Sequence, residues 1–163
     1  MSGKKYGSDK KSDIAFRVIS DHLRAVSFCI ADGQIPGNSG PSYVVRRILR
    51  RAIRYGYTFL NFSEPFIFKL VEIISEQFKS VFPEIDKQKL NIKSIIEQEE
   101  KVFLKTLSHG INKLNNVIEK AKSEIISGKD VFELYDTYGF PVDLTSLISV
   151  SYTHLTLPTK QPV

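Results

Sequence analysis

The chain has 163 residues, of which 42% are hydrophobic and 11% aromatic, an ordinary globular composition that excludes wholesale disorder. Its 23 Lys and Arg residues exceed its 18 Asp and Glu residues, and the net charge of +5 favours a polyanionic partner. The single cysteine, Cys29, excludes intrachain disulfides and cysteine-based metal sites. There is no apolar run of membrane-spanning length and no secretory signal, so we expect a soluble, cytoplasmic protein.

The first third of the chain predicts a lead-in, a helix and a loop. Residues 1–11 are polar and lysine-rich and form a loose lead-in. Ser12 is the expected N-cap of a helix, with Asp13 in its first turn, because apolar residues then recur at helical spacing until Asp32-Gly33. Residues 33–40 contain three glycines and one proline, which predicts a loop.

Helical patterns continue along the rest of the chain. A helix over 41–56 starts with a proline and ends with a glycine, the preferred residues at those positions. Another is expected over 65–82, followed by one long helix over 86–126 that is eased at Gly110. A short helix capped by Asp130 ends at Gly139, and Phe140-Pro141 opens a last element. We predict an all-α fold with a long antiparallel-packed helix and no sheet.

Residues 150–163 do not continue the helical pattern. The stretch from Val150 to Leu155 resembles the translated end of a sequencing-library transposon adapter. We therefore expect residues 150–163 to be a non-native tail and exclude them from the fold prediction. The alternative is an ordinary strand-prone terminus.

The helix over 41–56 concentrates the positive charge. No acidic residue lies between Asp32 and Glu64. A helical wheel puts apolar residues on one half and arginines on the other: Arg46, Arg47, Arg50, Arg51 and Arg54. Ordinary surface helices mix charges, and arginine makes forked contacts with phosphate, so we predict that all five face solvent and bind a polyanion. A solvated face, or pairing with carboxylates of neighbouring helices, is the alternative.

The sequence predicts neither an active site nor a metal or cofactor site in this chain. Its histidines are scattered without metal-ligand spacing: His22, His109 and His154. The glycine-rich loop over 33–40 lacks a preceding strand, so we assign it no nucleotide-binding role. Glu99 and Glu100 lie in a polar stretch of the long helix, and we interpret both as solvated.

Three segments, in order, resemble motifs of the alanyl-tRNA synthetase family. The first comprises Asp32-Gly33, Pro36-Gly37-Asn38 and residues 43–52, YVVRRILRRA. The second is EQEEKVFLKTL over 97–107, and the third is LYDTYGFPVDLT over 134–145. The resemblance implies that residues 12–149 form the helical domain that recognises the tRNA acceptor stem, as a fragment of a class II enzyme.

The resemblance also implies what lies outside this segment. The parent enzyme is expected to join alanine to its tRNA with ATP and magnesium, and to carry a zinc-containing editing domain. The adenylation motifs and the editing site are absent here, so the fragment alone is expected to be inactive. Its expected partners are the acceptor stem of alanine tRNA and the remainder of the synthetase, with no membrane.

Two positions in the family are associated with reading a G·U wobble pair, and the motifs place them at Asn38 and Asp136. The carboxylate of Asp136 suits the exocyclic amine that guanine exposes in the minor groove, and Asn38 offers both a donor and an acceptor. Alternatively, Asn38 serves the loop turn and Asp136 stabilises a helix end. The rival function is a free-standing helical protein-interaction module or a generic RNA-binding module.

Overall fold

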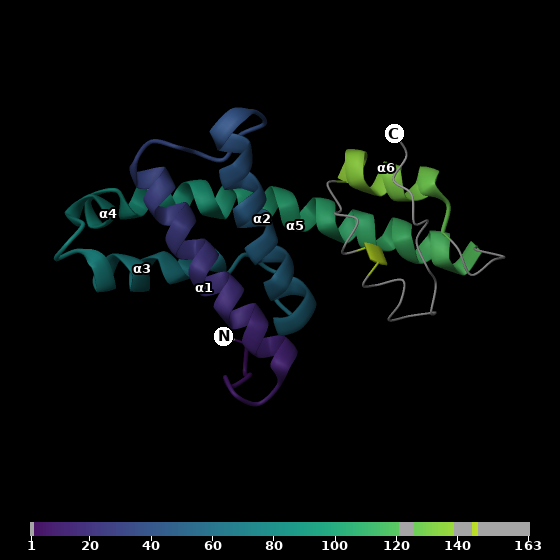
Figure 1. Cartoon of the computed structure of the whole chain (residues 1–163), viewed down its shortest axis with the longest axis horizontal. Coiled ribbons are helices and arrows are strands. Elements are labelled where there is room, and N and C mark those ends of the chain that lie inside the picture. Colours follow the sequence, from purple (N-terminus) through teal and green to yellow (C-terminus); the bar gives the residue numbers. More distant parts are fainter. Residues whose placement is uncertain (1, 121–125, 139–144, 147–163) are drawn as a thin grey trace. The chain divides into compact units, whose positions relative to one another are not determined.

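A computed structural model describes residues 2–120, 126–138 and 145–146 of the chain (Figure 1). These residues contain six helices and no strand, which confirms the all-α prediction for the described part. The chain divides into two compact units, Met1–Leu104 and Lys105–Val163. The expected tail over 150–163, the Gly139 helix end and the start at Phe140-Pro141 lie outside the described residues.

The first helix, α1 (Lys10–Ala31), begins earlier than predicted. Its N-cap is Asp9, whose carboxylate accepts hydrogen bonds from the backbone N–H groups of Lys11 and Ser12 at 3.4 and 3.0 Å. The predicted cap, Ser12, is wrong: it is buried in the first turn, and its hydroxyl donates to Asp9 at 2.8 Å. Asp13 does lie in the first turn, where a negative charge favours the helix dipole.

The second helix, α2 (Gly40–Leu60), runs beyond the predicted end at Gly56. It ends at Asn61, which adopts the left-handed conformation with φ 59°. Gly56 is needed for a close contact, because a Cβ atom there would lie 2.2 Å from the Phe66 ring. The glycine that resembled a helix cap therefore makes room for an aromatic side chain.

The predicted boundaries of the next two helices are also wrong. The segment forms α3 (Ile67–Phe78), α4 (Pro83–Lys87) and α5 (Lys89–Lys120). Proline suits the first turn of a helix, so Pro83 opens a separate short helix and does not end the preceding one. Gln88 caps α4 and donates its side-chain amide to the carbonyl of Ala31 at 2.7 Å. Gly110 lies within α5.

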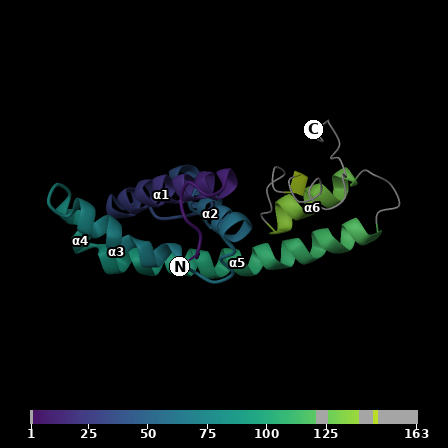
Figure 2. The ribbon, with the colours of Figure 1, turned by 90° about the horizontal axis from the view of Figure 1, so that it is seen from below.

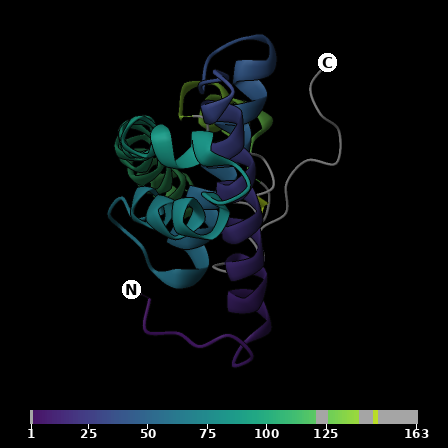
Figure 3. The same cartoon turned by 90° about the vertical axis from the view of Figure 1, so that its left-hand side faces the viewer.

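The unit Met1–Leu104 has two layers. Figure 2 shows α1 and α2 in one layer, and α3, α4 and the first half of α5 in the other. Figure 3 looks nearly along α5, with α1 crossing it steeply. The core between the layers consists of buried aliphatic side chains, including Leu23, Ile30, Leu49, Ile53, Ile67, Val71, Ile92 and Ile96. Removing this apolar surface from water stabilises the unit.

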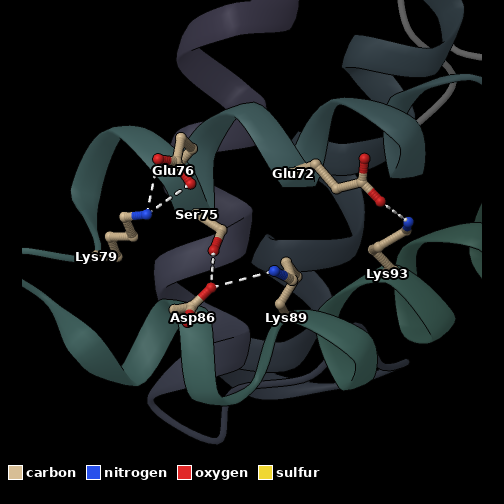
Figure 4. Close-up of polar contacts among 7 residues, drawn as sticks. All are labelled: Glu72, Ser75, Glu76, Lys79, Asp86, Lys89 and Lys93. Atoms are coloured by element: carbon tan, nitrogen blue, oxygen red, sulfur yellow. Dashed lines mark hydrogen bonds and ion pairs between the residues drawn. The ribbon is translucent and has the colours of Figure 1, made fainter.

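Polar contacts join α3 to α4 and to the start of α5 (Figure 4). Ser75 donates a hydrogen bond to Asp86 at 2.6 Å, and Lys89 pairs with the same carboxylate at 3.2 Å. Lys93 pairs with Glu72 across the two helices. These partners lower the pKa of each acid: the Ser75 hydrogen bond does so for Asp86, and the Lys93 hydrogen bond does so for Glu72.

The unit Lys105–Val163 contains the second half of α5 and α6 (Gly128–Tyr138). The hydroxyl of Ser127 accepts from the backbone N–H of Asp130 at 3.2 Å and donates to the Asp130 carboxylate at 2.6 Å. The capping residue is therefore Ser127, where Asp130 was predicted. Lys113 pairs with Glu133 at 3.1 Å. None of the helices formed by the described residues combines the length and the apolar character that a membrane span requires.

Candidate nucleic-acid interface

The five arginines of α2 differ in their surroundings, although the helical wheel groups them on one face. Arg46 and Arg50 are half-buried, with 22% and 28% of their side chains exposed. Arg47 and Arg51 are exposed. Arg54 is buried, with 8% exposed, so the prediction that all five arginines face solvent is wrong.

Glu99 of α5 pairs with both half-buried arginines. Its Oε1 atom lies 3.0 Å from Nε of Arg46 and 2.7 Å from Nη2 of Arg50. Arg50 also donates from Nε to the same oxygen at 2.9 Å, and its guanidinium lies 5.0 Å from the centre of the Phe103 ring. The Glu99 side chain is only 11% exposed, so its predicted solvated position is wrong. For these two arginines, pairing with a carboxylate of a neighbouring helix is confirmed.

Each exposed arginine lies four residues along α2 from a tyrosine whose ring it contacts. Arg47 lies 5.7 Å from the centre of the Tyr43 ring, and Arg51 lies 5.8 Å from that of Tyr55. Both distances suit cation–π contacts, which leave the outer edge of a guanidinium free to donate. Among the interactions of the described residues, Arg47 and Arg51 make no salt bridge. They are therefore the two arginines best placed to meet a phosphate.

Asn38 lies in the loop before α2 and is exposed. Its Oδ1 atom accepts a hydrogen bond from Nη1 of Arg46. The loop is also held by Gly37, whose N–H donates to the carbonyl of Ser42 at 2.9 Å. A Cβ atom on Gly37 would lie 2.7 Å from Cβ of Ser42, so only glycine fits this close approach. The predicted loop residue Asn38 thus contacts one of the predicted arginines.

Glu100 is a buried carboxylate that sequence analysis misplaced in solvent. It is 0% exposed and accepts hydrogen bonds from the backbone N–H groups of Phe66, Ile67 and Phe68 at 3.0, 2.9 and 3.0 Å. It therefore replaces the missing N-cap side chain of α3, where an anion also favours the helix dipole. Burial raises the pKa of the Glu100 carboxyl above its ordinary value, and the three backbone N–H groups oppose that shift.

A sequence signal for the burial of Glu100 exists in the spacing of α5. Ile92, Ile96 and Phe103 are buried, and Glu100 falls four residues after the second and three before the third. It thus occupies a position in the apolar stripe of the helix. A charged residue within such a stripe is buried and needs partners. If the apolar stripe of α5 had been located first, Glu100 would have been predicted to lie within it and to be buried.

Asp136, the second predicted base-reading residue, lies on α6 in the other unit. Its backbone is helical, and it follows the buried Val131 and Leu134 along the same helix. Among the described residues, no group of three or more His, Cys, Asp or Glu side chains could hold a metal ion.

Comparison with known proteins identifies relatives over most of the chain. Residues 1–154 match the family described as tRNA synthetases class II (A). The chain is 54% identical over 148 residues to an alanine–tRNA ligase of Christiangramia forsetii, covering 91% of this chain and 17% of that protein. It is 52% identical over 151 residues to the alanine–tRNA ligase of Cytophaga hutchinsonii, with the same coverage of both chains. The chain thus spans less than a fifth of the length of these relatives.

Proposed function

Because this chain belongs to the class II (A) tRNA synthetase family, as a segment of an alanyl-tRNA synthetase, we propose that it binds a tRNA acceptor stem and reads its G·U wobble pair. The whole protein is then an alanine–tRNA ligase that uses ATP and magnesium in the cytoplasm. Adenylation, and zinc-dependent editing, belong to other parts of that protein. This segment contributes to the choice of tRNA and not to bond formation.

The grip on the RNA backbone falls to Arg47 and Arg51. Their guanidinium groups are exposed, while Glu99 partly neutralises Arg46 and Arg50. A phosphate meeting α2 therefore finds two uncompensated positive charges on successive turns of the helix. This difference within one row of arginines is the observation that carries the proposal. Arginine suits it, because its planar fork matches the oxygens of a phosphate.

Base reading falls to Asn38 and Asp136. A-form RNA exposes its minor groove, where guanine offers an amine donor and both bases offer acceptors. A carboxylate only accepts hydrogen bonds, so Asp136 suits the guanine amine. Its negative charge opposes RNA phosphates in general, so its benefit depends on that one donor.

The test compares acceptor-stem duplexes that differ only in one base pair, G·U or G·C. We expect Asp136→Ala in the full-length synthetase to lose on the order of 1–3 kcal/mol of binding free energy on the G·U stem, the usual worth of a base contact. On the G·C stem, binding should be unchanged or slightly tighter, because a repulsive charge has gone. Equal losses on both stems would give Asp136 a structural role and contradict the reading proposal.

A further inference from the structure

Asn38 is the exposed end of a chain of contacts that begins on α5. Glu99 forms an ion pair with Arg46, with Oε1 3.0 Å from Nε but without a hydrogen bond from that nitrogen, and Arg46 donates a hydrogen bond from Nη1 to Oδ1 of Asn38. We propose that Glu99 and Arg46 are positioning residues for Asn38. This inference rests on the proposed reading of the acceptor stem by Asn38.

The chemistry of arginine fixes which way the amide of Asn38 faces. A guanidinium carries five N–H donors and no acceptor, so it can contact only the oxygen of the asparagine side chain. With Oδ1 engaged by Arg46, the Nδ2 amine of Asn38 is the end left for RNA. The group that we expect it to meet is the pyrimidine O2 in the minor groove, because the wobble shifts uracil relative to the cytosine of a G·C pair, whereas a purine N3 or a ribose 2′-hydroxyl is the same on both stems.

Glu99 is the fixed end of this series of contacts, because it is largely shielded from solvent and has a second arginine partner. Its side chain is 11% exposed, and Arg50 anchors it from the next turn of α2 at 2.7 Å. Arg50 in turn lies over the Phe103 ring at 5.0 Å. Arg46 thus has a partner on each side and little freedom to turn toward a phosphate. A residue held in this way orients its neighbour Asn38. Its replacement should therefore change the preference between the two stems more than the overall affinity for RNA.

Two variants separate the proposed contacts, and the readout is the ratio of the Kd for the G·C stem to the Kd for the G·U stem in the full-length synthetase. Asn38→Asp keeps an acceptor for Arg46 and removes the amine, so the ratio should fall roughly tenfold, the worth of one base contact. Glu99→Gln removes the negative charge that attracts Arg46 while Asn38 is intact, and the ratio should fall by about threefold, less than for removal of the amine itself. Glu97→Gln is the matched control, because Glu97 pairs with Lys101 of its own helix, at 2.7 Å, and the ratio should not change.

A double variant tests whether Glu99 acts through Asn38. The ratio for Asn38→Ala combined with Glu99→Gln should equal that for Asn38→Ala alone, because the second change has nothing left to position. Effects that multiply would overturn the inference. So would an unchanged ratio in Glu99→Gln when Asn38→Ala lowers it.

Hydrogen exchange of the loop over 33–42 distinguishes the positioning contact from the reading of the stem. Glu99→Gln should speed exchange there, with Glu97→Gln as control. If Asn38→Ala leaves the ratio unchanged while Glu99→Gln still speeds loop exchange, reading by Asn38 fails and the positioning contact stands. If Glu99→Gln speeds nothing and Asn38→Ala still lowers the ratio, the positioning contact fails and the proposed function stands.

Discussion

Charged residues along the first half of α5 are used in two different ways. Near its start, Lys89 and Lys93 each face one carboxylate, Asp86 and Glu72, on an exposed surface (Figure 4). Two to three turns later, Glu99 pairs with two arginines, and Glu100 accepts hydrogen bonds from three backbone N–H groups. Both carboxylates are largely shielded from solvent. The first region has separate pairs of opposite charge, and the second has one largely shielded and one buried anion, each with several donors.

The difference shows which charges the fold depends on and which remain for a ligand. A pair on the surface exchanges water for a partner at little net gain. A buried anion must be satisfied, since leaving its donors unpaired costs their full desolvation. Glu99 fixes α2 and Glu100 fixes α3 against α5, and because Glu99 pairs with Arg46 and Arg50, Arg47 and Arg51 remain the exposed cations of the arginine row.

The largest effect is expected at Glu100. Glu100→Ala removes the acceptor for three buried N–H groups at the start of α3, and we expect it to lower the free energy of unfolding by about 3 kcal/mol. Urea unfolding followed by helical circular dichroism measures this change. Glu97→Ala, on the same helix and with the same change of charge, should cost no more than about 0.5 kcal/mol. Similar costs at the two positions would contradict the capping role.

The next effect concerns RNA affinity. The double change Arg47→Gln and Arg51→Gln should raise the Kd of the full-length synthetase roughly tenfold or more on every stem, because phosphate contacts are blind to sequence. The slope of log K against log salt should flatten by about 0.7–0.9 for each phosphate that is no longer neutralised.

The matched control uses the balanced surface. The double change Lys89→Gln and Lys93→Gln also removes two positive charges from this unit. The slope of log K against log salt should stay as in the unmodified protein. An equal flattening in both double variants would mean that total charge, and not the arginine row, governs the affinity.

Sequence periodicity predicted the helices well because the apolar stripes are regular. The all-α fold, the loop before α2 and Pro41 in the first turn of α2 all follow from local chemistry. The boundaries failed where distant residues decide them. Gly56 resembles a helix cap until Phe66, ten residues later, occupies the space that a side chain would fill.

The arginine face failed for the same physical reason. A helical wheel separates polar from apolar residues within one helix, and it cannot show that Glu99, about fifty positions away, reaches two of the five arginines. Arg54 is polar by residue type and still buried. Asn38 was singled out through its motif, but its contact with Arg46 depends on how the loop folds back over α2.

The smallest effect is expected on the balanced surface itself. Lys93→Gln breaks the pair with Glu72, whose side chain keeps 63% of its surface in water. A carboxylate that is still hydrated loses little when its partner goes, so the free energy of unfolding should not change measurably. Urea unfolding of Lys93→Gln beside Glu100→Ala makes the comparison directly. A destabilisation in Lys93→Gln as large as in Glu100→Ala would show that exposed pairs also hold α3 to α5, and burial would then not explain why one carboxylate matters more than another.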